Sequence, residues 1–315
     1  MPHIAILVPC YNEEATIAQV VRDFRAALPD ATVYVYDNNS RDRTVEEAQN
    51  AGAVVRREPR QGKGNVVRRM FADIEADIFV LVDGDDTYDA GSAPRMIAAM
   101  LEHGSDLITA RRIHTEAAAY RPGHVFGNRL LTGLTAWLFN VRLSDMLSGY
   151  RVFSRRFVKS FPFTAEGFGI ETELTVHAVR LMMPMDEVDT RYKERPAGSV
   201  SKLNTWRDGY RILRTIGHLV REERPFVYFS AGFTVLALAS VLISLPLVQE
   251  YLDTGQVPRL PTAILATGLM LLAFLSLTCG LILDTVTRGR WEQKRMAYLA
   301  MPGPQDLLVE NRPKS

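Results

Sequence analysis

Short apolar runs alternate with longer amphipathic stretches up to about residue 110. The short runs are rich in valine, isoleucine and tyrosine, which favour strands. They predict four strands, over residues 3–9, 32–37, 53–58 and 77–83. The stretches between them carry an apolar residue every three or four positions and predict helices over 14–28, 40–52 and 62–76. This alternation predicts an α/β fold, in which helices cover both faces of a mostly parallel sheet.

Two much longer apolar runs, 226–248 and 260–283, contain no charged residue. An α-helix rises ~1.5 Å per residue, so each run is long enough to cross the ~30 Å hydrocarbon core of a bilayer. A pair of buried core helices is the alternative, but uncharged runs of this length are rare in soluble cores. The pattern therefore predicts a hairpin of two transmembrane helices near the C-terminus.

Basic residues flank this hairpin on both outer sides. They are Arg207, Arg211, Arg214, Arg221, Arg224, Arg288, Arg290, Lys294 and Arg295. The connection over 249–259 sets a single Arg259 against Glu250 and Asp253. By the positive-inside rule, both chain ends lie in the cytosol and the connection lies outside. This predicts a multi-pass protein of the inner (cytoplasmic) membrane.

Residues 205–224 carry an apolar stripe beside an arginine-rich one at helical spacing. Such a helix suits the surface of an anionic membrane, and packing on its own domain is an equal alternative. The predicted organisation is a cytosolic α/β domain over 1–204, this juxtamembrane helix, two transmembrane helices over 225–284 and a cytosolic tail over 285–315.

Composition narrows the class of protein. Hydrophobic residues make up 47% of the 315 residues and charged residues 23%, which is typical neither of a disordered chain nor of a wholly membrane-embedded one. The net charge of +1 gives no support for nucleic-acid binding. Neither the two cysteines nor the six histidines have metal-ligand spacing, so a reducing cytosolic setting fits. The N-terminus lacks the basic region of a signal peptide.

Three polar clusters follow three of the predicted strands. They are YNEE at 11–14, DNNSRD at 37–42 and DGDD at 83–86. The carboxyl ends of parallel strands meet at one edge of a sheet, where α/β proteins bind ligands. The sequence therefore predicts a site at this edge. No glycine-rich dinucleotide or P-loop motif is present to suggest those two classes of site.

Asp83 and Asp85 flank Gly84, and a glycine there would let the backbone turn sharply, so that both carboxylates face one point. Hard oxygen ligands favour Mg²⁺ or Mn²⁺, usually with phosphate oxygens and water completing the coordination. The alternative is a solvated acidic turn in which Asp89 or Ser92 caps the following helix. That alternative leaves Asp83, at the end of its strand, unexplained.

The chain carries six motifs in order: VPCYNEE, DNNSRDRT, RQGKGNVVRR, DGDDTYD, DMLSGYRVF and RYKERPAGSVSK. Together they resemble the family 2 glycosyltransferases with a GT-A fold, and most of all the polyprenyl-phosphate glycosyltransferases, the group of dolichyl-phosphate mannose synthase. The resemblance covers residues 3–204, and the C-terminal hairpin is similar to the two-helix anchors of some members. Many mannose synthases have a glutamine where Thr87 stands, which weakens the assignment of mannose as the sugar.

The resemblance implies roles for the matching residues. Those implied to bind the nucleotide sugar are Pro9, Tyr11, Glu13, Asp37, Lys63 and Asp83; Asp37 would accept a hydrogen bond from the base, which suits uracil, and Lys63 would approach the diphosphate. Those implied to act in catalysis are Asp85, Arg111, Asp145, Arg151, Glu171 and Glu173. Those implied to bind the phosphate of the acceptor are Arg195, Ser201 and Lys202. Asp83 and Asp85 would hold Mg²⁺ or Mn²⁺.

The residue types suit the chemistry of such a reaction. A nucleotide sugar and a lipid phosphate are both anionic, so cations must neutralise them as they approach. Arginine and lysine pair well with phosphate oxygens. A phosphate monoester with a second pKa of ~6 is largely ionised at neutral pH, so it needs no strong general base. The expected function is an inverting transfer of a sugar from a nucleotide sugar, UDP-linked by expectation, to polyprenyl phosphate at the cytosolic face of the membrane.

Three alternatives stay open. An enzyme of the same fold could glycosylate a glycan or glycolipid, a membrane scaffold could have kept the fold without catalysis, and a nucleotidyltransferase could share the sheet. The last would normally open with a glycine-rich loop, which VPCYNEE is not. The sugar, the prenyl chain length and a homo-oligomeric state also stay open.

Overall fold

The computed structural model describes residues 2–114, 145, 148–161, 169–193, 220–221 and 224–307. The chain forms two compact units, one of Met1–Gly209 with Lys294–Ser315 and the other of Tyr210–Gln293. The predicted phosphate-binding residues Arg195, Ser201 and Lys202 lie outside the described residues, as does most of the predicted juxtamembrane helix.

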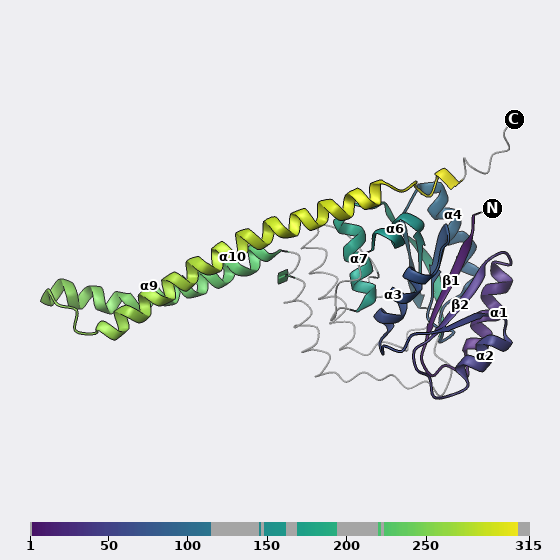
Figure 1. Ribbon diagram of the computed structural model, residues 1–315, viewed down its shortest axis with the longest axis horizontal. Coiled ribbons are helices and arrows are strands. Elements are labelled where there is room, and N and C mark those ends of the chain that lie inside the picture. Colours follow the sequence, from purple (N-terminus) through teal and green to yellow (C-terminus); the bar gives the residue numbers. More distant parts are fainter. Residues whose placement is uncertain are drawn as a thin grey trace. The chain divides into compact units, whose positions relative to one another are not determined.

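A seven-stranded sheet forms the centre of the first unit, in the order β3-β2-β1-β4-β6-β5-β7 (Figure 1). Its strands are β1 (Ile4–Cys10), β2 (Thr32–Asp37), β3 (Val54–Arg57), β4 (Ile78–Leu81), β5 (Leu107–His114), β6 (Arg151–Ser154) and β7 (Met185–Tyr192). Among these strands, β6 alone runs antiparallel to its neighbours, β4 and β5. The prediction of a mostly parallel α/β sheet is confirmed, and the four strands predicted before residue 110 correspond to β1–β4.

Helices cover both faces of this sheet (Figure 1). The described ones are α1 (Ile17–Ala27), α2 (Thr44–Asn50), α3 (Lys63–Asp73), the 3₁₀ turn η1 (Ala90–Ser92), α4 (Ala93–His103), α6 (Arg155–Ser160) and α7 (Ile170–Arg180). Alternate strand residues point to opposite faces, so each face has its own apolar layer. Ile6 and Val80 pack with Phe24 of α1 on one side. Phe71 of α3 packs edge-on against Phe153 on the other.

Two helix ends have clear structural causes. The second predicted helix stops at Gly52, whose φ of 90° is a conformation that favours glycine. Before α4, the Asp89 carboxylate accepts a hydrogen bond from the Gly91 N–H at 3.2 Å, whereas Ser92 makes no capping bond. Asp89 is therefore the capping residue of this turn, and Asp83 and Asp85 remain available for another role.

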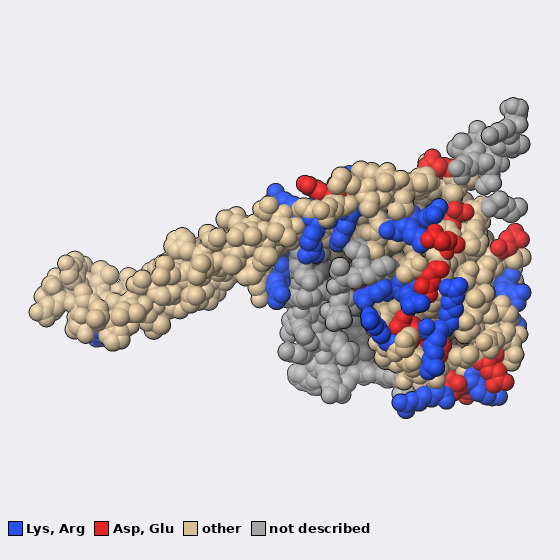
Figure 2. All heavy atoms as spheres, viewed as in Figure 1, with Lys and Arg blue, Asp and Glu red and all other residues tan. Residues whose placement is uncertain are grey.

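The second unit consists mainly of α9 (Pro225–Thr254) and of α10 (Leu260–Leu299), which continues into the first unit. Both helices are long and apolar enough to span a membrane, and only 6% and 17% of their most apolar stretches are buried. Figure 2 shows the hairpin almost free of charged atoms. The Ser240 hydroxyl donates to the Ala266 carbonyl at 2.7 Å, and the Ser276 hydroxyl donates to the Phe229 carbonyl at 3.0 Å. These bonds join the two helices along their length.

The segment from Lys294 onward packs within the first unit. The Tyr298 hydroxyl donates at 2.7 Å to Asp106, a fully buried carboxylate just before β5. Arg156 binds both oxygens of Asp106, at 2.6 and 2.8 Å, and its guanidinium lies 4.6 Å from the centre of the Tyr298 ring. Part of the region predicted as a cytosolic tail is thus built into the α/β domain.

Candidate active site

Three strand ends and two helix starts bring the predicted site residues of the α/β domain together. Strands β1, β2 and β4 are parallel neighbours, so the segments that follow them emerge at the same edge of the sheet. They carry Glu13, Asp37 and the Asp83–Asp85 pair. Lys63 opens α3 and Glu171 lies in the first turn of α7. The structure therefore places polar residues from distant parts of the sequence at one edge, as the motif pattern predicted.

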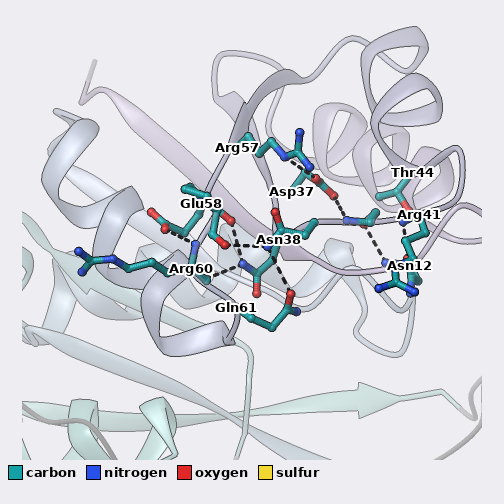
Figure 3. A network of polar contacts seen from close by, with 12 residues as sticks. Asn12, Asp37, Asn38, Arg41, Thr44, Arg57, Glu58, Arg60 and Gln61 are labelled. Carbon is teal, nitrogen blue, oxygen red and sulfur yellow. Dashed lines mark hydrogen bonds and ion pairs between the residues drawn. The ribbon is translucent and has the colours of Figure 1, made fainter.

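Asn38 organises one end of this edge, next to Asp37 (Figure 3). Its side-chain amide donates to the carbonyls of Glu58 and Arg60 at 2.9 and 2.8 Å, and its side-chain oxygen accepts from the Gly62 N–H at 2.7 Å. Because Asn38 is buried, these bonds fix the loop that leads from β3 into Lys63. Sequence reasoning quoted this asparagine within DNNSRD but assigned it no role.

Asp37 is also buried, and its oxygens are partly engaged (Figure 3). One accepts from the Ser40 N–H at 3.0 Å, and the other lies 3.8 Å from Nε of the exposed Arg57. The Asn12 side chain accepts from the Arg41 N–H at 2.8 Å, which ties the segment after β1 to the segment after β2. The carboxylate predicted to contact the nucleotide base is thus held in place by its own loop.

Lys63 connects the predicted donor and catalytic residues. Its ammonium lies 2.5 Å from Asp83 Oδ1 and 2.7 Å from Glu171 Oε1. Burial alone would lower the pKa of Lys63, but the Asp83 and Glu171 carboxylates outweigh it and raise that pKa. For Glu171, Lys63 likewise outweighs burial and lowers the pKa. Lys63 and Glu171 are therefore both charged at neutral pH. Glu173 lies in the same helical turn as Glu171 and is half-buried.

The glycine between Asp83 and Asp85 is needed for space, not for an unusual backbone angle. A Cβ on Gly84 would lie 2.1 Å from Glu13 Oε2 and 2.8 Å from Cys10 Sγ. The left-handed conformation in this turn belongs instead to Asp86, with φ of 55°. The chain does turn at Gly84, as predicted, but the turn needs no left-handed angle there. The need for glycine comes from the side chains of Cys10 at the end of β1 and of Glu13 just after it.

Glu13 lies against this turn in a largely desolvated position. Burial, followed by the charges of Asp83 and Asp85, raises the pKa of Glu13 to about 8. Its Oε2 is buried without a hydrogen-bond partner. Burial and Glu13 also raise the pKa of the Cys10 thiol. A carboxyl kept neutral beside two carboxylates is the expected response to repulsion between like charges.

Asp85 is more buried than Asp83 and is oriented by its own turn. Its Oδ1 accepts from the Thr87 hydroxyl at 2.6 Å and from the Thr87 N–H at 3.3 Å. The Thr87 carbonyl in turn accepts from the Lys193 N–H at 2.8 Å, just after β7. Thr87, noted in the sequence only as a departure from mannose synthases, therefore positions Asp85.

Arg151 is a buried residue that connects two segments of the site. It is fully buried, donates to the Ser148 carbonyl at 3.0 Å and to the Thr175 hydroxyl at 2.9 Å, and its pKa is lowered by burial to about 10. Thr175 also donates to the Glu171 carbonyl at 2.9 Å. Arg151 thus links the SGYR motif to the first turn of α7. Tyr150 of the same motif is a core residue, packed edge-on against Phe24.

The two arginines at the end of β5 differ sharply in their partners. Arg111, the predicted active-site arginine, is half-exposed and pairs with Asp189 of β7. Arg112 binds Asp145, a predicted catalytic residue, through two hydrogen bonds. Burial opposes the charge of Arg112, but Asp145 outweighs it and raises the pKa. Sequence reasoning singled out Arg111 and gave Arg112 no role. Successive side chains of a strand point to opposite faces of the sheet, so the two arginines meet different partners.

The remaining predicted residues of this end, Pro9 and Tyr11, lie at the end of β1 and just after it. Pro9 is buried and Tyr11 is exposed.

The carboxylate oxygens at this edge of the sheet suit a hard divalent cation. Within the described ranges, no group of three His, Cys, Asp or Glu side chains is arranged to hold a metal by itself. Two carboxylates are nonetheless what Mg²⁺ needs when diphosphate oxygens and water supply the other ligands. Asp83 and Asp85 are the two carboxylates that fit Mg²⁺ or Mn²⁺ here.

Sheet order, strand-end carboxylates and the lysine at the start of α3 define an α/β transferase of the GT-A type. The model of the family described as glycosyl transferase family 2 matches residues 5–161. The chain is 37% identical over 241 residues to the glycosyltransferase AglJ of Haloferax volcanii, which covers 74% of this chain and 78% of that protein. The protein belongs to glycosyl transferase family 2.

Two further similarities bear on donor and acceptor. The dolichyl-phosphate hexose transferase of Haloferax volcanii is 29% identical over 222 residues, 70% of this chain and 95% of that protein. The crystal structure of glucosyl-3-phosphoglycerate synthase from Mycobacterium tuberculosis in complex with Mn²⁺, UDP and phosphoglyceric acid superimposes with a TM-score of 0.56 at 25% identity. It covers 70% of this chain and 78% of that one. The predicted family and GT-A fold are confirmed.

Proposed function

We propose that the protein transfers a hexose from a UDP-sugar to a polyprenyl phosphate at the cytosolic face of a membrane, with a divalent metal and with inversion at the anomeric carbon. The observation that carries this proposal is the presence, in one chain, of a glycosyltransferase site and two helices long and apolar enough to span a membrane. A transferase with two soluble substrates gains nothing from such a hairpin. A lipid-linked acceptor stays in the membrane, so the enzyme that uses it must be held there.

The donor end supports a nucleoside diphosphate. Buried Asp37 offers a carboxylate to a base N–H, which uracil has, and Lys63 offers a cation to the diphosphate. The structurally similar synthase from Mycobacterium tuberculosis was crystallised with Mn²⁺ and UDP. In this chain Asp83 and Asp85 would hold the metal, which would neutralise charge on the departing UDP.

The acceptor end supports a phosphate. Arg112 lies near the DGDDTYD turn, because Tyr192, under its guanidinium, contacts Tyr88 of that turn. Arg195, Ser201 and Lys202 belong to this proposal through the sequence motif that contains them. The related dolichyl-phosphate hexose transferase acts, by its name, on a lipid phosphate.

The proposed reaction needs little proton transfer. An ionised phosphate oxygen of the lipid attacks the anomeric carbon as the bond from that carbon to the UDP oxygen breaks, so the sugar passes to the lipid and UDP leaves. Asp145 orients the guanidinium of Arg112, and Glu171 orients the ammonium of Lys63. The arginines would attract the acceptor phosphate, and Asp83 and Asp85 would hold the donor diphosphate on the opposite side through the divalent cation that they bind.

The flanking charges support the topology within this proposal, with both chain ends cytosolic and the connection after α9 outside. This arrangement is compatible with a homo-oligomer within the membrane. The size of the purified complex in detergent tests for it.

The test is incubation of the full-length protein with a panel of nucleotide sugars and undecaprenyl phosphate, followed by mass analysis of the lipid. A sugar phosphate lipid formed by the wild type and lost in Asp85→Asn supports the proposal. Transfer only to an oligosaccharide or glycolipid would overturn the acceptor assignment. Lack of both transfer and nucleotide binding would favour an inactive membrane scaffold.

A further inference from the structure

Lys63 is held where a metal ligand is needed. Its ammonium contacts Asp83 Oδ1 at 2.5 Å, and Asp83 is one of the two carboxylates at the strand end that suit a divalent cation. A cation arriving alone must share this oxygen with an ammonium or displace it. Displacement would leave Lys63 with Glu171 as its remaining carboxylate partner among the contacts of the described site.

The position of Lys63 is set by the backbone as well as by these ion pairs. Gly62, directly before it, has φ of 126° and donates its N–H to the buried Asn38 side chain. Asp83 cannot move toward Gly149, because its Oδ2 already lies where a Cβ on Gly149 would be only 2.3 Å away. Both partners of the Lys63–Asp83 contact are thus positioned by the surrounding backbone.

A bound diphosphate would give the Lys63 ammonium an alternative partner to Asp83. Phosphate oxygens are strong acceptors for an ammonium, and Lys63 lies at the start of α3, where exposed backbone N–H groups also favour anions. Moving the ammonium to a diphosphate frees Asp83 Oδ1, and the same diphosphate supplies oxygens to a cation. Nucleotide and cation then stabilise each other's binding.

We propose that Lys63 is an interlock, an internal cation that occupies Asp83 until a nucleoside diphosphate draws it away, so that metal and nucleotide enter the site as a coupled pair. The inference rests on the metal and UDP use put forward under Proposed function, and it adds a coupling between the binding of the two. Coupling of this kind is reciprocal, so each ligand must tighten the other by the same factor.

The test measures Mn²⁺ binding to the full-length protein in detergent, by the spin-resonance signal of free Mn²⁺, with and without UDP. For the wild type, UDP should tighten Mn²⁺ binding at least about 10-fold. Lys63→Met should bind Mn²⁺ alone about 10-fold more tightly than the wild type does, because a competing unit charge has gone. The factor gained from UDP should shrink to less than about 3-fold.

Two other variants sharpen the comparison. Lys63→Arg keeps a cation beside Asp83 and should retain most of the coupling. Lys193→Met is the matched control, since Lys193 pairs with Asp86 of the same turn, at 3.3 Å, without touching Asp83. It should bind Mn²⁺ as the wild type does.

The outcomes separate the interlock from the function on which it rests. A wild type that binds Mn²⁺ with UDP, beside a Lys63→Met that binds Mn²⁺ alone no more tightly, would overturn the interlock only. A wild type that binds no Mn²⁺ even with UDP would overturn both. If Lys63→Met fails to fold, methylation of Lys63 in the wild type decides, read by mass spectrometry. UDP without metal should change the rate at which Lys63 is methylated. An unchanged rate of methylation would overturn the interlock.

Discussion

The guanidinium of Arg112 binds both carboxylate oxygens of Asp145, with Nε at 2.6 Å and Nη2 at 2.8 Å. Both side chains are mostly buried, at 23% and 11% exposed, and Arg112 also lies 5.4 Å from the centre of the Tyr192 ring. Arg111, one residue earlier, pairs with Asp189 and keeps 47% of its side chain exposed. Of two adjacent arginines in TARR, Arg112 is therefore the one joined to a predicted catalytic carboxylate.

Replacing Arg112 with methionine should cost far more activity than the same change at Arg111. Removing one partner of a desolvated pair leaves the other charge uncompensated, at about 3–5 kcal/mol for fully buried pairs. Arg112 is partly exposed, so we expect a loss of about 100-fold in kcat/KM for the acceptor, and a smaller loss for Arg111→Met. Arg112→Lys should recover only part of it, because one ammonium cannot replace the two-bond fork. Equal losses at the two arginines would contradict this assignment.

Gly149→Ala should weaken metal and nucleotide binding without unfolding the protein. A Cβ at this position would lie 2.3 Å from Asp83 Oδ2, so the carboxylate must move. A displacement of this size should reduce Mn²⁺·UDP affinity by at least about 10-fold, measured by calorimetry. Gly289→Ala is the control, because an added Cβ there meets nothing within 4 Å. Unchanged affinity in Gly149→Ala would show that Asp83 is not held as the structure indicates.

Much of this site could be predicted from the sequence, because strand ends and their polar motifs are local features. The four parallel strands, the edge that carries Glu13, Asp37 and Asp83, and the cap at Asp89 all follow from short-range patterns. Residues that act through distant partners could not be found in this way. Arg112, for example, gained its role by bonding Asp145, 33 residues further along the chain.

The reason for Gly84 shows the same limit. Its sequence position suggested a sharp turn, which the structure has, but not the crowding by Glu13 and Cys10 that excludes a side chain there. Packing of Tyr298 and Arg156 on Asp106 is likewise invisible in a pattern, since they lie 192 and 50 residues from Asp106 in the chain. Long-range packing decides these positions, and local periodicity carries no signal for it.

Glu13→Gln should change how the stability of the metal-free protein depends on pH. The pKa of Glu13 is raised to about 8 in the folded protein, chiefly by burial, whereas an unfolded glutamate ionises near pH ~4.3. Between these values the folded protein holds a proton that the unfolded chain has released, so the contribution of Glu13 to the free energy of unfolding falls as pH rises. Above about pH 8 it levels off.

Thermal unfolding of the full-length protein in detergent, from about pH 5 to about pH 8, provides the measurement. The Tm of Glu13→Gln relative to the wild type should rise steadily across this range, because glutamine does not ionise. Glu14→Gln, at the exposed neighbouring position, should follow the wild type. Parallel pH curves for Glu13→Gln and the wild type would show that Glu13 is ionised in the folded site.

Tyr298→Phe should destabilise the α/β domain while leaving nucleotide binding intact. The lost hydroxyl donates to Asp106, which is fully buried, and a hydrogen bond to a buried charged group contributes about 1.5–3 kcal/mol. Asp106→Ala should cost more, because it also leaves the half-buried Arg156 without its carboxylate. Asp106 precedes β5, at the sheet edge away from the carboxyl ends of the parallel strands, so UDP affinity measured well below Tm should match the wild type. Tyr228→Phe, on a half-exposed tyrosine of α9, is the control. A Tm for Tyr298→Phe equal to that of the wild type would show that the end of α10 adds no stability through this contact.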